Sequence, residues 1–317
     1  MNVRKIDINE FRKRKLERSY ISVYIVIKSI AVETENVVEP KNLCVIYGFT
    51  ALGARKIIAL YFENTEDNRF WLNIFEDLKS RNLKNIMFLV TPKNKNIERC
   101  AKIVYNNIEI VRSPEDIMAS IDIFFAVRTS RTLEIQLKNL LLADNIDMCK
   151  EKIEFFKQEY LHNKLVLSVF EKQEQDILNL YKYNYDIRKL LYQYYAIRDI
   201  KRQINKLNVL QPLCFDIVSV TEHFLEYICS FERGLSYSKK GWIRLINILY
   251  EIYPKKMDEF LGYDKSSHQD KSTENRRNGY TSKAKKVKTD YGEITICPPR
   301  DREGKFEPKI IKKSKEF

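Results

Sequence analysis

Three apolar runs in succession are the feature that most constrains how this chain folds. The run "SVYIVIKSIAVET" is rich in β-branched residues, and "NLCVIYGF" and "ARKIIALYF" follow it at short intervals. Residues of this kind favour pleated, half-buried strands. We therefore expect three consecutive strands near 22–34, 42–49 and 55–62. Because the connections are short, neighbouring strands should be antiparallel.

The apolar period changes after the third strand. In "RFWLNIFEDL" apolar residues recur every three to four positions, which predicts a helix with Thr65 and Asn68 near its start. A compact run, "NIMFLV", predicts a buried strand at 85–90, followed by a helix near 95–105 and a strand near 108–111. This order predicts an α/β fold with a mixed central sheet. It is the order found in RNase H-like domains.

The rest of the chain divides by composition. From 114 to about 254 the pattern is almost entirely helical, whereas the segment after Gly262 is polar, charged and poor in apolar residues. Beyond it, "KKVKTDYGEITIC" predicts a hairpin in which Gly292 supplies a positive φ. We expect a basic segment at 1–20, a domain at 21–255 with a helical insertion at about 114–186, a linker at 256–274 and a basic hairpin segment at 275–317.

The positive charge is concentrated at the two ends. The formal net charge is +13, of which residues 1–18 carry +4 and residues 265–317 carry +7. Such ends attract a polyanion, and nucleic acid is the first candidate. The alternative is that the basic ends are only solvated. No apolar run reaches the roughly 18 residues that a membrane span needs, and the start lacks the apolar core of a signal peptide. We expect a cytoplasmic chain without membrane contact.

Cysteine and histidine usage disfavours several kinds of site. The six cysteines form no Cys-x-x-Cys pair, and most lie among apolar neighbours, which favours reduced structural thiols. The three histidines are widely separated in the sequence. A histidine-based metal site or a nucleophilic triad is therefore disfavoured.

Three stretches resemble bacterial transposases of the Mutator type. "NRRNGYTSKAKKVKTDYGEITICPPRDREGKFEPKII", at 275–311, is similar to the basic segment of that family. "TEDNRFWLNIFEDLKSRNLKNI", at 65–86, is similar to the helix after the third strand of its RNase H-like domain, and "IRKLLYQYYAIRDIKRQINK", at 187–206, to the helix with its last catalytic acid. In the family the basic segment precedes the catalytic domain, whereas here it follows. This order implies a permuted relative or, as we favour, a junction between two decayed elements.

The resemblance also implies a metal site whose ligands are replaced. Family members hold two divalent cations, Mg²⁺, with Asp, Asp and Glu. The matching residues here are Lys28, Pro92 and Arg198, and the family's Cys-x-x-His pair is absent from "IEIVRSPED". We therefore expect no catalytic residues, no metal ligands and no cofactor. Alternatively these are ordinary residues: Lys28 snorkels, Pro92 ends a strand, and Arg198 and Arg202 form a solvated face with Asp199.

DNA contact is the activity that the basic segment favours. Guanidinium and ammonium groups suit phosphate contacts, and Tyr280 among them can stack or pack on sugar. The alternative is that the two arginines near its end pair with Glu293, Asp301 and Glu303. No base-reading helix is identifiable. The candidate DNA-binding residues are Arg276, Arg277, Lys283, Lys285, Lys286, Lys288, Arg300, Arg302 and Lys305.

The sequence therefore predicts a degenerate, transposase-derived protein that binds duplex DNA and can form homo-oligomers. The tyrosine cluster "YKYNYDIRKLLYQYY" is interpreted as packing rather than as a stacking platform for single-stranded DNA. A rival interpretation is a non-enzymatic protein whose helical insertion binds a protein partner. A third is a relic with marginal stability.

Overall fold

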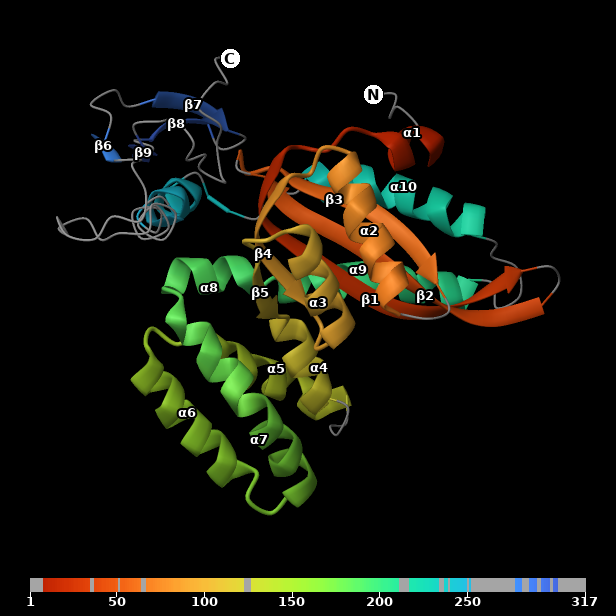
Figure 1. Cartoon of the computed structure of the whole chain (residues 1–317). Coiled ribbons are helices and arrows are strands. Elements are labelled where there is room, and N and C mark those ends of the chain that lie inside the picture. The colour runs from red at the N-terminus through yellow and green to blue at the C-terminus, as the bar shows by residue number, and fades with distance from the viewer. Residues whose placement is uncertain are drawn as a thin grey trace.

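The fold is mixed α/β, with one five-stranded sheet, helices on both of its faces and a helical bundle beside it (Figure 1). Within the described residues, no helix combines the length and apolar character that crossing a membrane requires. The computed structural model describes residues 8–34, 37–50, 52–63, 67–122, 127–210, 217–233, 237–238, 240–249, 251, 277–280, 285–289, 292–296 and 299–301.

The sheet has the strand order β3-β2-β1-β4-β5. The first three strands form an antiparallel meander, because β1 pairs antiparallel with β2 and β2 with β3. β4 lies parallel to β1, and β5 lies parallel to β4. The strands are β1 (Ser19–Thr34), β2 (Val37–Thr50), β3 (Arg55–Glu63), β4 (Asn85–Thr91) and β5 (Glu109–Arg112).

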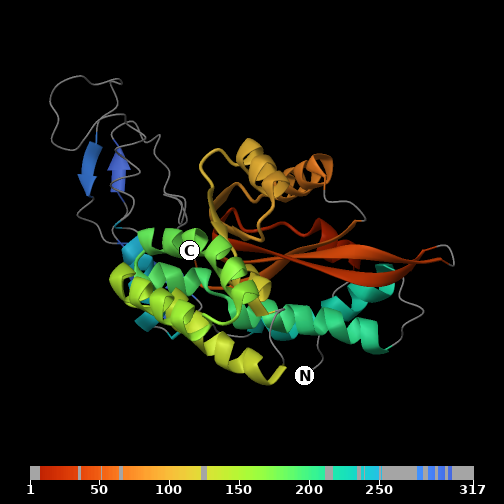
Figure 2. The same ribbon diagram turned by 90° about the horizontal axis from the view of Figure 1, so that it is seen from below.

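Both faces of the sheet are covered, so alternate residues of β1 enter two different cores. Val23 and Ile25 pack on the side of α2 (Asn68–Ser80) and α3 (Lys95–Val104). Tyr24 and Val26 pack on the opposite side, where α9 (Tyr194–Leu210) and α10 (Ile217–Arg233) lie. Figure 2 shows the sheet between these two helical layers. The near-continuous apolar sequence of β1 follows from this double burial.

Local chemistry fixes α2 on its face of the sheet. The Asp67 carboxylate accepts a hydrogen bond from the Phe70 backbone amide at 2.8 Å and so caps the helix. Trp71 and Phe75 are fully buried, and burying a side chain of this size contributes about 1.5–3 kcal/mol. The cap is therefore Asp67, which lies between the expected Thr65 and Asn68.

On the opposite face, α10 contacts the edge strand β3. Arg55 donates from Nε and Nη2 to the carbonyl of Phe231 at 3.1 and 2.6 Å. The backbone amide of Ile57 donates to the Glu232 carboxylate at 3.1 Å. Edge strands carry unpaired backbone groups that favour association with other strands. These contacts occupy part of that edge.

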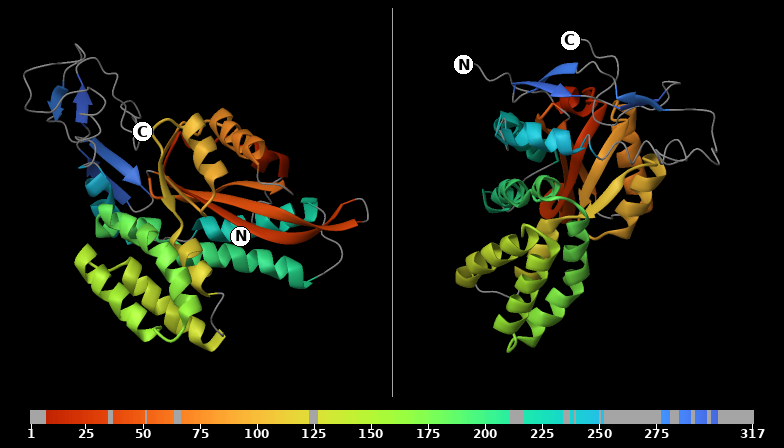
Figure 3. Two further views of the ribbon diagram at one scale, coloured as in Figure 1. Left: turned by 60° about the horizontal axis from the view of Figure 1, so that its bottom comes forward. Right: turned by 90° about the vertical axis from the view of Figure 1, so that its left-hand side faces the viewer.

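The helices between β5 and α9 form a bundle beside the sheet, which Figure 3 shows from two directions. All of them except the last, which runs on to Leu191, lie within the range 114–186 where a helical insertion was expected. Their interface includes Phe156 stacked on Phe170, with ring centroids 4.3 Å apart. The elements are α4 (Pro114–Asp122), α5 (Val127–Leu141), α6 (Ile146–Glu159), α7 (Lys164–Asn179), the 3₁₀ turn η1 (Leu180–Lys182) and α8 (Tyr185–Leu191).

Strands and helices occur in the expected order over residues 19–112. The largest difference is in β2, which begins at Val37 rather than near 42, so the β1–β2 hairpin is longer than expected. Outside this body the structure describes a short helix, α1 (Ile8–Lys13), and residues 240–249 are helical. The described strands beyond it are β6 (Arg277–Tyr280), β7 (Lys285–Thr289), β8 (Gly292–Ile296) and β9 (Pro299–Asp301).

Candidate functional site

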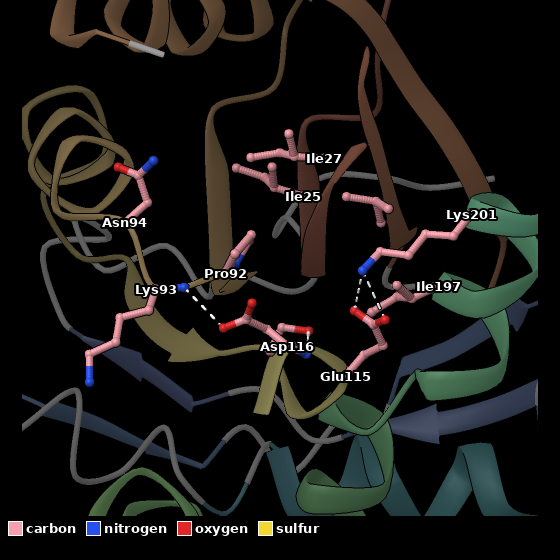
Figure 4. Close-up of a pocket in the computed structure, with 11 residues that line it drawn as sticks. Ile25, Ile27, Pro92, Lys93, Asn94, Glu115, Asp116, Ile197 and Lys201 are labelled. Carbon is pink, nitrogen blue, oxygen red and sulfur yellow. Dashed lines mark hydrogen bonds and ion pairs between the residues drawn. The ribbon is translucent and has the colours of Figure 1, made fainter. Parts of the chain in front are cut away.

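A pocket of about 270 Å³ opens where β4 ends, between β1 and α9. We call it the strand-end pocket. Its floor is apolar, and its rim carries two carboxylates and two lysines (Figure 4). It is lined by Ile25, Val26, Ile27, Pro92, Lys93, Asn94, Ser113, Glu115, Asp116, Ile197 and Lys201.

Strand pairing decides which β1 residue lies beside Pro92. In the parallel register Tyr24 pairs with Val90, so Val26 is level with Pro92 two residues further along. Lys28 lies two residues beyond Val26, is half-buried and does not line the pocket. The structure therefore brings Pro92 to the pocket but places Val26 there instead of Lys28.

The residues of α9 that face the pocket also differ from the expected Arg198. Ile197 and Lys201, one turn apart, face the pocket. Arg198 lies on the neighbouring helix face, where its Nη1 pairs with Glu134 of α5 at 2.6 Å and 57% of its side chain is exposed. A hydrogen bond with Tyr194 and the charge of Glu134 raise the pKa of Arg198 above its ordinary value. Arg198 is therefore a charged surface residue outside the pocket.

Both carboxylates of the pocket are engaged by cations of the protein. Lys201 Nζ donates to Oε1 and Oε2 of Glu115, each at 2.8 Å, and the Glu115 side chain is only 10% exposed. Asp116 Oδ2 accepts from Nε and Nη2 of Arg112 at 3.0 and 2.9 Å. The backbone amide of Lys93 also donates to Asp116, at 3.3 Å. The pocket thus contains two satisfied ion pairs.

Arg112 extends this charge network away from the pocket. Its Nη1 pairs with Asp176 of α7 at 2.5 Å and also donates to the Gln173 side chain. Lys93 Nζ lies 3.3 Å from the same Asp176 carboxylate. The network joins β5, α4 and α7 and so fixes the bundle to the end of the sheet.

The residues present do not fit a site for two divalent cations. Such a site needs several carboxylate oxygens around each ion. Val26, Pro92 and Ile197 supply none, while Glu115 is paired with Lys201 and Asp116 with Arg112. Within the part of the chain that the structure describes, no three His, Cys, Asp or Glu side chains lie close enough to share a metal ion.

The candidate DNA-binding residues fall partly within the described strands. Arg277 belongs to β6, Arg300 to β9, and Lys285, Lys286 and Lys288 to β7. β7 pairs antiparallel with β8, and β6 with β9. Arg276, Lys283, Arg302 and Lys305, together with the expected linker at 256–274, lie outside the described residues.

Sequence reasoning missed the pair Glu115–Lys201, which joins α4 to α9 across the pocket. A signal was available on α9, because Ile197 and Lys201 are four residues apart and share a helix face. Glu115 follows directly on the β5–α4 junction, at the carboxyl end of a parallel strand. Their contact depends on residues 86 positions apart, which no local pattern reveals.

The tyrosines of the cluster at 181–195 mostly pack, as interpreted. Tyr183 and Tyr192 are each 8% exposed, and the ring of Tyr183 meets Phe88 at 5.5 Å. Tyr181 donates to the carbonyl of Leu140. Tyr195 is the most exposed tyrosine of the cluster, at 53%.

Comparison with known proteins places the chain in a family. It matches the family described as "Transposase, Mutator family" over residues 3–211 and 237–316. The transposase for insertion sequence element ISRM3 of Rhizobium meliloti (strain 1021) is 20% identical over 201 residues, which are 63% of this chain and 50% of that protein. The probable transposase for insertion sequence element ISRM3-like of Sinorhizobium fredii (strain NBRC 101917 / NGR234) is 19% identical, with the same coverage. The chain spans about half the length of these curated relatives. It belongs to the Mutator family of transposases.

Proposed function

We propose that this chain is a DNA-binding member of the Mutator family that has lost the metal-dependent chemistry of transposition. The observation that carries the proposal is the composition of the strand-end pocket. Val26, Pro92 and Ile197 are apolar, and the ammonium of Lys201 occupies the Glu115 carboxylate. A metal ion would have to displace this ammonium from the carboxylate, because at 4 Å and an effective dielectric near 20 the two cations repel each other by about 4 kcal/mol per unit of metal charge.

The sheet supports an RNase H-like origin for this pocket. Its order, β3-β2-β1-β4-β5, combines an antiparallel meander with two parallel strands added on the far side of β1. We propose that the ancestral acids occupied the level of Val26 and Pro92 and the pocket-facing side of α9. We thus assign two of the three lost positions to Val26 and to the pocket-facing side of α9, rather than to Lys28 and Arg198.

Loss of catalysis is tested with supercoiled plasmid, purified full-length chain and either Mg²⁺ or Mn²⁺. We expect no nicking above a protein-free control, and no heat of Mg²⁺ binding by calorimetry. A catalytically competent family member in parallel reactions shows that the conditions support the chemistry. Nicking that co-purifies with the chain and is abolished by EDTA would overturn the proposal.

DNA binding is assigned to the basic segment at 275–317, because cations at this density release counterions from duplex DNA. The test is fluorescence anisotropy of a labelled duplex across a salt series. The test variant replaces Arg277, Lys285, Lys286, Lys288 and Arg300 by Gln. The matched control replaces five exposed cations of the body by Gln: Arg69, Lys150, Lys164, Lys172 and Lys189.

Each phosphate contact contributes about 0.9 to the slope of log affinity against log salt. We expect the tail variant to lose several units of slope, and the control to lose markedly less. If both variants lost the same salt slope, only the net charge of the chain would matter for DNA binding, and the basic segment would not be a DNA-binding module. In that case the partner-binding interpretation gains support.

The second candidate function is binding of a protein partner through the helical bundle. Three large apolar side chains are exposed there: Phe155 in α6 at 64%, Leu161 in the turn after it at 62%, and Leu165 in α7 at 56%. Exposed large apolar residues in one region are typical of interaction sites. A salt-independent complex with a purified partner, lost on replacing these three residues by Ser, would favour this function over DNA binding.

A further inference from the structure

We infer that the outer face of α9 binds single-stranded DNA. The face consists of Tyr195, Arg198, Arg202 and Lys206, which we call the α9 stripe. Their spacing of three, four and four residues places all of them on one side of the helix. The side chains of Arg198 and Arg202 are 57% and 69% exposed, and Lys206 is exposed as well.

Burial of the opposite face fixes the direction of the stripe. Ile197, Ile200 and Ile204 are at most 2% exposed and belong to the core against the sheet. Rotating α9 to hide the stripe would expose these three apolar side chains to water, which is unfavourable. The stripe is therefore held outward by the fold.

The ring of Tyr195 is surrounded by positive charge. Lys138 Nζ of α5 lies 5.4 Å from its centroid, and the Arg198 guanidinium lies at 5.9 Å. The residue nevertheless stays 53% exposed. Sites for single-stranded DNA combine such exposed aromatic rings, on which bases stack, with cations that track the backbone.

The charge of this surface remains positive after its internal pairs are counted. Arg198 pairs with Glu134 and Arg202 with Asp199, whereas Lys138 and Lys206 pair with no acid of the described residues. Both arginines are more than half exposed, and ion pairs with a solvated member contribute little, so phosphate oxygens can replace the carboxylates. Four cations against two acids leave a surface complementary to a polyanion.

The exposed ring favours a single strand over a duplex. Only an unpaired base offers its π-face to a side chain, whereas a duplex hides the faces by stacking. From Tyr195 to Lys206 the helix rises about 17 Å, at 1.5 Å per residue. That length accommodates at most about five phosphates of one strand, at 3.4 Å each.

The test uses full-length chain and a fluorescein-labelled 20-nucleotide oligo-dT in a salt series. The stripe variant carries Arg198→Gln, Arg202→Gln and Lys206→Gln. The control variant carries Lys150→Gln, Lys172→Gln and Lys189→Gln, three exposed lysines outside the stripe. Because a single strand contributes about 0.7 per phosphate contact, we expect the stripe variant to lose about 2 units of salt slope relative to wild type. The control should keep its slope.

Tyr195 is tested separately, because stacking is independent of salt. Tyr195→Ala should weaken oligo-dT binding about five-fold or more with an unchanged slope, and Tyr195→Phe should retain the affinity. Thermal unfolding of each variant, expected to match wild type, excludes misfolding as the cause.

Wild-type chain that does not bind oligo-dT, or stripe and control variants that bind it equally, would overturn the inference. So would a Tyr195→Ala variant with wild-type affinity. The inference shares with the proposed function the assumption that DNA is the partner, but it assigns a different surface. The stripe variant should therefore leave the tail-dependent duplex slope intact, so that failure of one proposal is distinguishable from failure of the other.

Discussion

The Glu115–Lys201 ion pair of the strand-end pocket can be broken with little change in side-chain volume. Lys201→Met keeps most of the aliphatic stem and removes the ammonium, which leaves the Glu115 carboxylate without a counter-charge at 10% exposure. Removing one partner of a buried pair costs about 3–5 kcal/mol. Lys201 is 27% exposed, so water reaches the site in part, and we expect a loss of about 2–3 kcal/mol.

The assay is urea unfolding followed by fluorescence of the two buried tryptophans, Trp71 and Trp242. A loss of this size lowers the midpoint by about 1 M urea. The matched control is Arg202→Met, which breaks an exposed pair to Asp199 on the same helix and should cost less than about 1 kcal/mol.

A double variant separates charge burial from packing. Replacing both Lys201 and Glu115 by Met removes the charges together, and such replacements are often neutral or stabilising. We expect the double variant to recover most of the lost stability. If Lys201→Met costs no more than Arg202→Met, or if the double variant is as unstable as the single one, the pair is not what holds α9 to the bundle.

Two further predictions concern the sheet. A Cβ at Gly48 would lie 2.6 Å from the Ser22 carbonyl oxygen, so Gly48→Ala should lower the free energy of unfolding, measured in urea, by about 1–3 kcal/mol. Gly241→Ala, in a helix and 3.2 Å from the Ser238 hydroxyl oxygen, should not. Burial raises the pKa of the Tyr24 and Tyr47 hydroxyls well above the ordinary value for tyrosine. The stability that these neutral hydroxyls contribute is therefore complete below about pH 10 and falls as the pH rises. An alkaline titration followed at 295 nm should show their ionisation only together with unfolding.

The sequence predicted the order of strands and helices because each element has its own local period. It did not predict which residues meet in the pocket. A strand repeats every two residues, so Val26 and Lys28 lie on the same face, and only the pairing of β1 with β4 shows which one is level with Pro92.

The sequence also did not show which face of α9 points into the pocket. Arg198 and its neighbour Ile197 are about 100° apart around the helix axis. Burial of Ile197 against the sheet decides the question, and that contact joins segments far apart in the sequence. Local patterns therefore predict that a site helix exists, whereas long-range packing decides which of its side chains reach the site.

The topology of the sheet also sets an order of assembly. Two residues separate β1 from β2, and four separate β2 from β3, so the meander closes over short loops at low entropic cost. Pairing of Ser19 with Asn85 closes a far longer loop, and α9 reaches the sheet later still in the sequence. Contacts between distant segments form slowly. We therefore expect the strand-end pocket, built from β1, β4 and α9, to form after the meander and to be lost when α9 detaches.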